Sequence, residues 1–261
     1  MDRVHSDQSD QLANKSTGEP ASAEVLGVRV DCLTMAEAVD CCMRFLKTAG
    51  HHQVVTVNPE FVMLAQHDAP FRSAIRNASL VVPDGAGIVW AMRRQGFVDA
   101  ERVTGIDLMQ ALCVRAAQEQ VPVFLLGAAP GIAVKAAAIL QQEIPDLTVA
   151  GTAVGSPDPK HAAGLCAQIR ESGAGILFVA FGCPAQDFWI QQYQEETGAR
   201  LAIGVGGSFD YISGAVTRAP LWVRGMNLEW CYRLFRQPWR WRRQLTLIPY
   251  VWKILREKPR H

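Results

Sequence analysis

The sequence lacks several patterns that would point directly to one function. Its seven cysteines include no Cys-x-x-Cys pair and no His/Cys spacing of a zinc site, and an odd number does not suit a disulfide framework. The sequence contains no run of 18 apolar residues, so no segment is predicted to span a membrane by itself. There is no Gly-x-Gly-x-x-Gly, no P-loop lysine motif and no Asp-x-Asp. These absences argue against NAD or ATP binding and against a divalent metal held by an Asp-x-Asp motif, and the cysteines fit a reducing cytoplasm.

Charge and aromatic residues are distributed unevenly along the chain. Residues 1–23 are polar, with no apolar signal-peptide core, and we expect a disordered N-terminal arm. The net charge of +1 hides an excess of +9 over residues 218–261 and of −8 over the rest. Five of the seven tryptophans also lie in the last 44 residues. The sequence therefore predicts an acidic catalytic core over 24–218 and a basic, aromatic appendage over 219–261.

Short apolar runs alternate with helical patterns through the core. We expect strands at 24–30, 53–57, 80–82, 121–126, 147–152, 175–181 and 200–205. We expect helices at 35–47, 59–77 (with an optional break at Pro70), 86–94, 105–119, 131–143, 159–172 and 185–197. Continuously apolar strands are typical of parallel strands buried on both faces. The pattern predicts an α/β fold: a Rossmann-like, mostly parallel sheet with helices on both faces and ligands at the carboxyl ends of its strands.

The appendage has a different, helical pattern. Asn227 is suited to cap a helix that ends near Arg236, and Pro238 is suited to begin a second helix that runs towards Arg256. Pro249 is expected to kink or interrupt that second helix.

Basic and aromatic residues mix along these helices. Arg240 and Arg243 share one face of the second helix, Trp241, Leu245 and Ile248 lie near one another on a different face, and Arg233 extends the positive charge. Interfacial helices have this composition, so we predict association with an anionic membrane surface. Nucleic-acid binding is the alternative for any basic patch, and the acidic core and apolar tail argue against it.

Three expected strands in the second half end in glycine, where backbone N–H groups can approach a phosphate. We predict that these ends form a cradle for a nucleotide diphosphate, although each is also compatible with a plain tight turn. Gln186 is placed to hydrogen-bond the ligand, and Asp210 to accept from a ribose or a base. The alternatives are a solvated helix residue and a turn-forming aspartate. The cradle glycines are Gly127, Gly182, Gly206 and Gly207.

Two strand ends in the first half carry polar side chains. Thr56 and Asn58 follow one strand, Asp84 follows another, and both ends lie at the same edge of a parallel sheet. A carboxylate beside hydroxyl and amide groups can act as a general base on a sugar hydroxyl. Arg102 precedes a helix that starts at this edge and can neutralise a diphosphate. Pro-Asp-Gly is also a common turn, Thr56 and Asn58 can be structural caps, and Arg102 can be a surface residue.

Six motifs together resemble the WecG/TagA/CpsF family of glycosyltransferases, glycosyltransferase family 26, over residues 26–255. They are TVNPEFVMLAQ at 56–66, VVPDGAGIVWA at 81–91, RVTGIDLM at 102–109, FVAFGCPAQDFWI at 178–190, GVGGSFDYISGAVTRAP at 204–220 and LEWCYRLFRQPWRWRR at 228–243. The resemblance implies inverting, metal-independent and cofactor-free transfer of N-acetylmannosamine, its uronic acid or glucose from a UDP-sugar donor. The implied acceptor is a polyprenyl-diphosphate-linked sugar. The resemblance also implies that this protein is peripheral and lies on the inner face of the plasma membrane.

The resemblance also implies roles for matching residues. Asp84 is the expected general base, with Thr56 and Asn58 beside it and Arg102 in the site, and Gln186 is expected near the donor nucleotide. Three appendage arginines are expected to meet the acceptor diphosphate, and a homo-oligomer is possible through the surface that the appendage covers. The stretch 151–157 lacks the aromatic residue of many relatives, so no base-stacking residue is assigned. The three arginines are Arg233, Arg240 and Arg243.

Two other classes of function remain open from the sequence. A non-catalytic regulatory or scaffold protein of a polysaccharide assembly complex would bind a UDP-sugar with the same cradle and show no turnover. A dinucleotide-dependent oxidoreductase would bind NAD, and the missing Gly-x-Gly-x-x-Gly argues against it.

Overall fold

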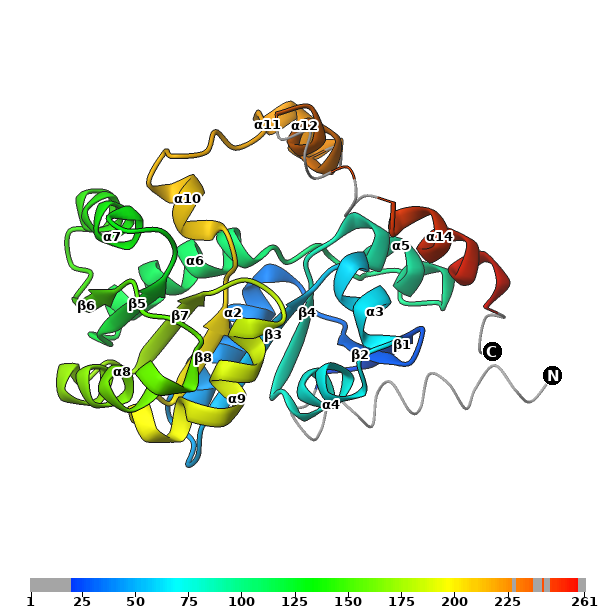
Figure 1. Ribbon diagram of the computed structural model, residues 1–261. Coiled ribbons are helices and arrows are strands. Elements are labelled where there is room, and N and C mark those ends of the chain that lie inside the picture. The colour runs from blue at the N-terminus through cyan, green and yellow to red at the C-terminus, as the bar shows by residue number, and fades with distance from the viewer. Residues whose placement is uncertain (1–19, 227–228, 237–240, 242–244, 258–261) are drawn as a thin grey trace.

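The main sheet of the protein has six strands, all parallel, in the order β4-β3-β8-β7-β5-β6 (Figure 1). The computed structural model describes residues 20–226, 229–236, 241 and 245–257, except the side chains of 233, 235 and 236. The predicted Rossmann-like α/β fold is confirmed. The strands are β3 (His52–Val57), β4 (Leu80–Pro83), β5 (Val123–Gly127), β6 (Val149–Ala153), β7 (Ile176–Ala180) and β8 (Leu201–Gly204).

Helices cover both faces of this sheet because neighbouring side chains on each strand point to opposite faces. In β3, for example, Val54 belongs to one apolar cluster and Val55 to another. The helices on the Val54 face are α2 (Met35–Phe45), α6 (Gly105–Gln118), α7 (Ile132–Glu143) and α10 (Ser208–Ile212). The opposite face carries α3 (Pro59–Ala65), α4 (Ala69–Asn77), α5 (Ala86–Arg94), α8 (Pro159–Ser172) and α9 (Ala185–Thr197).

Local capping fixes where several helices begin. Thr34 forms a capping box with Glu37 at the start of α2. Asp68 caps α4 by accepting a hydrogen bond from the backbone N–H of Phe71, and Pro70 lies in the first turn of that helix. The expected helix over 59–77 is therefore two helices, with the break just before Pro70.

The expected single strand over 24–30 is wrong, because this segment is a β-hairpin. β1 (Ser22–Val25) pairs antiparallel with β2 (Val28–Asp31), and the turn places Leu26 at φ 48° and Gly27 at φ 79°. Glycine at the second position makes such a turn accessible. The buried carboxylate of Asp31 accepts a hydrogen bond of 2.8 Å from the N–H of Val81, which ties the hairpin to the edge strand β4.

The C-terminal helices differ from expectation. The described part contains α11 (Leu221–Gly225), which we did not predict, then α12 (Glu229–Arg236) and α14 (Leu247–Arg256). A continuous helix from 238 to 256 is wrong, because residues 245 and 246 form a turn. Pro249 lies in the first turn of α14, a position that tolerates proline, and does not interrupt the helix. Asn227 and Pro238 lie outside the described residues.

Tyr250 and Ile254 attach α14 to the core. Both side chains are at most 2% exposed, and they belong to the apolar cluster that includes β1, β2 and α5. Among the described residues, no helix combines the length and apolar character needed to cross a bilayer.

Gly127, the last residue of β5, illustrates how tightly the carboxyl edge is packed. A Cβ atom here would lie 2.8 Å from the backbone carbon and oxygen of Ala180 in β7, and the residue has φ 106°. We expect Gly127→Ala to lower the free energy of unfolding by about 2 kcal/mol or more, because the backbone must shift and alanine avoids this φ. Urea denaturation of the purified variant measures the change.

Gly164→Ala is the matched control. Gly164 lies inside α8, and nothing lies within 4 Å of the position that a Cβ atom would take there, so alanine is expected to raise the free energy of unfolding by about 0.5–1 kcal/mol. Equal stability of the Gly127 variant and the wild type would show that β5 and β7 approach less closely than described.

Candidate active site

A cavity of about 790 Å³ opens at the carboxyl ends of β3, β4, β7 and β8. It lies where parallel α/β sheets bind their ligands. Eight of the site residues expected from the sequence line it: Thr56, Asn58, Asp84, Arg102, Gly182, Gln186, Gly206 and Gly207.

Asp84 reaches the cavity because the ends of β3 and β4 are packed against each other. Its backbone N–H donates to the carbonyl of Val57 at 2.9 Å, which extends the pairing of the two strands. A Cβ atom on Gly85 would lie 2.7 Å from Cδ of Pro59, so only glycine permits this approach of the two loops. The Pro-Asp-Gly sequence thus connects the end of β4 to the N-cap of α5 and places a half-buried carboxylate at the cavity wall.

Thr56 and Asn58 have structural roles as well as positions in the cavity wall. The Asn58 Oδ1 atom accepts a hydrogen bond of 3.2 Å from the N–H of Phe61 and caps α3. The Thr56 hydroxyl donates to the carbonyl of Gly204 at 3.4 Å, from β3 to β8. The capping alternative is therefore correct for Asn58, and it accounts for the place of this side chain at the site.

Gln186 is buried, with 2% of its surface exposed, so it is not a solvated helix residue. Its Oε1 atom accepts from the N–H of Gly182 at 3.2 Å and from the N–H of Gly206 at 3.1 Å. These two N–H groups are therefore bonded within the protein, whereas the sequence led us to expect them on a phosphate. Gln186 instead fixes the loops after β7 and β8 relative to each other.

Several helix N-termini supply positive potential in place of those two amides. The first residues of α3, α5, α6 and α10 all line the cavity. Unpaired N–H groups and the helix dipole make such ends favourable for anions. The N-termini of α5 and α6 and the Arg102 guanidinium are therefore favourable positions for an anion, although the carboxylates of Glu60, Asp84 and Glu229 line the same cavity.

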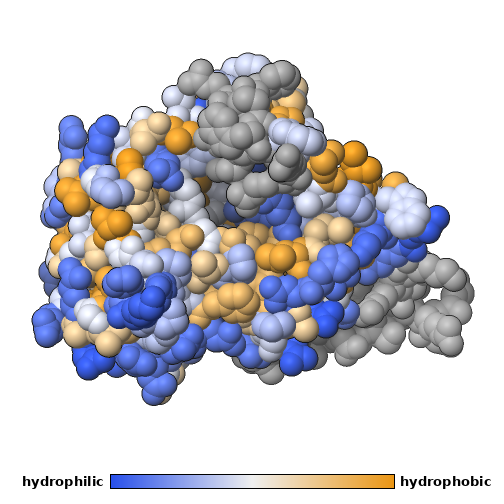
Figure 2. Space-filling view, viewed as in Figure 1, coloured by the Kyte–Doolittle hydropathy of each residue, from blue (hydrophilic) through white to orange (hydrophobic). Residues whose placement is uncertain are grey.

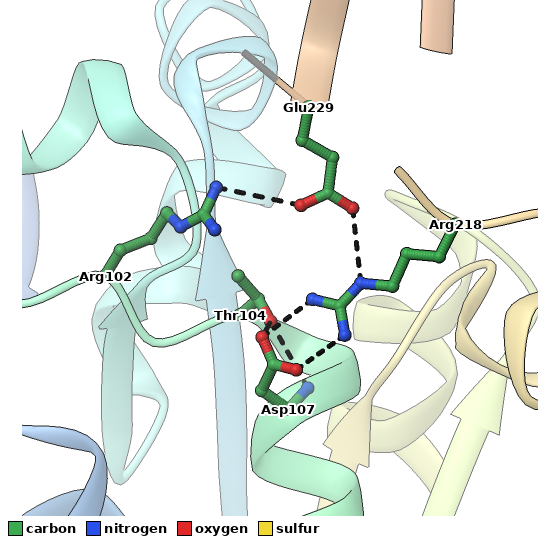
Figure 3. A network of polar contacts seen from close by, with 5 residues as sticks. All are labelled: Arg102, Thr104, Asp107, Arg218 and Glu229. Carbon is green, nitrogen blue, oxygen red and sulfur yellow. Dashed lines mark hydrogen bonds and ion pairs between the residues drawn. The ribbon is translucent and has the colours of Figure 1, made fainter. Parts of the chain in front are cut away.

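Arg102 belongs to a polar network that the sequence did not reveal (Figure 3). Its Nη1 atom lies 3.7 Å from Oε2 of Glu229, whose other carboxylate oxygen lies 3.4 Å from Nε of Arg218. Arg218 in turn pairs with Asp107. Asp107 and Arg218 both stand inside motifs quoted above, but neither has a local pattern that marks it as half of a pair.

The C-terminal helices form one wall of the cavity. Tyr250 donates its hydroxyl to the carbonyl of Gly87 at 2.9 Å, and its burial raises the pKa of the phenol well above the usual 10. Arg240 and Arg243 lie outside the described residues, and Arg233 belongs to α12 with its side chain outside them. The lining residues of this wall are Glu229, Trp230, Leu247, Ile248, Tyr250 and Val251.

Two expected site residues do not line the cavity. Gly127 is explained by its contact with Ala180, described above. Asp210 lies on α10, where burial raises the pKa of its carboxyl group, and its backbone carbonyl accepts from the N–H of Val216 at 3.0 Å. The structure therefore brings the second and third glycine loops to the cavity and leaves the first beside it.

The fold and this cavity define a Rossmann-like α/β protein with a site at the carboxyl edge of its sheet, closed on one side by C-terminal helices. Residues 23–261 match the Glycosyl transferase WecG/TagA/CpsF family, and the chain belongs to this family of glycosyltransferases. It is 33% identical over 205 residues to the N-acetylglucosaminyldiphosphoundecaprenol N-acetyl-beta-D-mannosaminyltransferase of Bacillus subtilis (strain 168), covering 78% of this chain and 79% of that protein. The enzyme of the same name from Bacillus spizizenii is 34% identical over 206 residues, with the same coverage.

Asp187, next to Gln186, is fully buried, and neither of its carboxylate oxygens has a hydrogen-bond partner among the described residues. Burial raises the pKa of this carboxyl group from 3.8 to about 7. Because the folded-state pKa exceeds the unfolded value, stability is fully present below about pH 4 and is lost as the pH rises towards and through 7. We expect the wild type to be less stable at pH 8 than at pH 5 by about 2–4 kcal/mol through this group.

Asp187→Asn tests this expectation, because asparagine has the shape of the acid and does not ionise. Urea denaturation at pH 5 and pH 8 should show a smaller loss of stability for the variant than for the wild type. Asp146→Asn, at an exposed position, serves as the control and should follow the wild type. An equal loss for wild type and Asp187→Asn would mean that Asp187 finds a partner in solution.

Proposed function

We propose that this protein transfers a hexosyl group from a UDP-sugar to a polyprenyl-diphosphate-linked sugar, in the synthesis of a cell-surface polysaccharide. The single observation that supports it best is the position of Asp84, a carboxylate at the wall of a cavity where the N-termini of α5 and α6 and Arg102 are favourable for a diphosphate. A base beside an anion-binding region is the equipment that glycosyl transfer from a nucleotide diphosphate needs.

In the proposed reaction, Asp84 accepts the proton of the acceptor hydroxyl as that oxygen attacks the anomeric carbon. The bond from the anomeric carbon to the β-phosphate oxygen breaks on the opposite face, and UDP leaves with the electron pair. The transition state resembles an oxocarbenium ion, as in other glycosyl chemistry. Thr56 and Asn58 line the cavity on the same side of the sheet edge as Asp84 and are assigned to orienting the acceptor.

Stabilising the negative charge that develops on the departing diphosphate is assigned to protein groups. Arg102 and the N-termini of α5 and α6 are the candidates among the described residues, because they face the cavity together. Arg233, Arg240 and Arg243 are proposed, from the family resemblance, to meet the acceptor diphosphate. Transfer is therefore proposed to be metal-independent, and activity that persists in EDTA is the expected result.

Both the donor sugar and the stereochemistry are proposed from the relatives. Their names specify transfer of N-acetyl-beta-D-mannosaminyl to N-acetylglucosaminyldiphosphoundecaprenol. A single displacement on an α-linked nucleotide sugar inverts the anomeric carbon and gives a β-linked product, which agrees with that name. UDP-N-acetylmannosamine is therefore the first donor to test, followed by its uronic acid and UDP-glucose.

The appendage is proposed to associate with the membrane surface that holds the acceptor. Exposed apolar side chains gather where α14 lies, at the upper right of the space-filling view (Figure 2). In the same helix, the guanidinium carbon of Arg256 lies 3.5 Å from the ring centroid of Trp252. Apolar side chains with a basic neighbour suit an anionic bilayer surface. The exposed large apolar residues of α14 are Ile248, Val251, Trp252 and Leu255.

Asp84→Asn is the direct test of the mechanism. We expect acceptor-dependent UDP release to fall by about 10³-fold, because asparagine cannot accept the proton, while UDP binding stays within about twofold of the wild type. Release is measured with purified protein, a panel of UDP-sugars and short-chain prenyl-diphosphate sugars, and binding is measured by calorimetry.

Asp99→Asn, at an exposed loop position, is the matched control and should retain full activity. Loss of UDP binding along with turnover in Asp84→Asn would make Asp84 structural. Tight UDP binding by the wild type without transfer to any acceptor would instead favour a regulatory or scaffold protein.

A further inference from the structure

Five polar side chains connect the core to the C-terminal helices, and we call them the Arg218 network (Figure 3). Arg102, Thr104 and Glu229 line the cavity, whereas Asp107 and Arg218 do not. The network therefore connects three residues of the cavity wall to Asp107 and Arg218, which lie outside the wall. Its members are Arg102, Thr104, Asp107, Arg218 and Glu229.

The network is anchored at the start of α6. Asp107 lies in the first turn of this helix, where the dipole favours a carboxylate, and its Oδ2 atom accepts from the Thr104 hydroxyl at 2.5 Å. Burial alone would raise the pKa of Asp107, and the hydrogen bonds from Arg218 and Thr104 outweigh it, so the pKa lies below its usual value. Asp107 is therefore held as a fixed anion.

Arg218 is held by Asp107 in one orientation. Its Nη1 and Nη2 atoms donate to Oδ1 and Oδ2 at 2.6 Å and 2.7 Å, and a bidentate pair of this kind fixes the plane of the guanidinium. The side chain is only 15% exposed. With both terminal nitrogens occupied, Nε of Arg218 points towards Glu229, as Figure 3 shows.

Glu229 is the first residue of α12 and depends on two arginines. Its carboxylate lies 3.4 Å from Arg218 and 3.7 Å from Arg102, and its side chain is 14% exposed. A carboxylate so far removed from water is costly without its partners. Trp230, the next residue of α12, lines the cavity. The place of the first turn of α12 at the cavity thus follows from the orientation of Arg218.

We propose that Arg218 is a positioning residue for transfer: through Glu229 it holds the first turn of α12 against the cavity, at the side where the lipid-linked diphosphate acceptor binds. This inference rests on the function proposed above. Arg218 does not line the cavity, so its effect on transfer passes through Glu229. The contacts to Asp107 are shorter than the contact to Glu229, so a disturbed network separates between Arg218 and α12 and leaves α6 intact.

Arg218→Met is the main test. We expect amide hydrogen exchange over 229–236 to accelerate about tenfold, and the KM for a short-chain prenyl-diphosphate sugar to rise by about the same factor, with kcat and UDP affinity within about twofold. Arg218→Lys keeps the charge but cannot form the bidentate pair together with the Nε contact, so an intermediate effect is expected.

Arg115→Met is the matched control. Arg115 lies near the other end of α6 and also bridges two carboxylates, Asp40 and Glu119, but away from the cavity. It should change neither the exchange of 229–236 nor the acceptor KM. An equal effect of the two arginine variants would mean that any lost ion pair loosens α12, and would overturn the proposal.

A double-mutant cycle with Glu229→Gln tests whether the two residues act together. If Arg218 acts through Glu229, the double variant should show an acceptor KM within about twofold of the worse single variant, because the second change removes an interaction already lost. Fully additive effects, unchanged exchange over 229–236 in Arg218→Met, or faster exchange with an unchanged acceptor KM would each overturn the proposal. Without transfer by the wild type the proposed function fails, and the exchange measurement still decides whether Arg218 holds α12.

Discussion

The parallel direction of all six strands in the main sheet is the constraint on which the site depends. Parallel strands require a crossover between them, so each carboxyl end and the N-terminus of the next helix lie at one edge. Three such N-termini, those of α3, α5 and α10, reach the cavity beside Asp84, and α6, which follows α5, also begins there. The topology thereby gathers partial positive charge next to a carboxylate, although Arg102 is the one cationic side chain among the described residues that line the cavity.

At this edge of the sheet, the Gln186 side chain gives the glycine loops a role that the sequence did not predict. A glycine after a strand suggests an N–H group offered to a phosphate, but a buried amide oxygen accepts from both Gly182 and Gly206. The side chain also explains Gly204, where a Cβ atom would lie 2.5 Å from its Nε2 atom. Gly204 therefore makes room for the Gln186 side chain, and the N–H groups of Gly182 and Gly206 bond to its amide oxygen, which connects β7 to β8.

The sequence predicted most features that depend on neighbouring residues and missed those that depend on residues far apart in the chain. The strands were predictable because continuous apolar runs are a local signal, and Asp84, Thr56 and Asn58 were predictable because they follow such runs. The hairpin at 22–31 was missed because Leu26, Val28 and Val30 alternate with polar or small residues as they would in a single strand. In the structure the buried residues are Ala23 and Val25 before the turn and Val28 and Val30 after it, so the alternation changes phase at Leu26 and Gly27. The Arg218–Asp107 pair spans 111 positions, and such a contact leaves no periodic trace in a single sequence.

Among the described C-terminal helices, α14 and α12 meet the core through contacts of different chemistry. α14 is held by Tyr250 and Ile254 in an apolar cluster, whereas the first turn of α12 is held by the carboxylate of Glu229 between two arginines. Apolar burial is insensitive to anionic ligands and is not screened by salt, but an ion pair next to a diphosphate site competes with both. The two contacts therefore respond to different conditions: salt and anionic ligands act on the contact of α12 and leave the apolar contact of α14 unchanged.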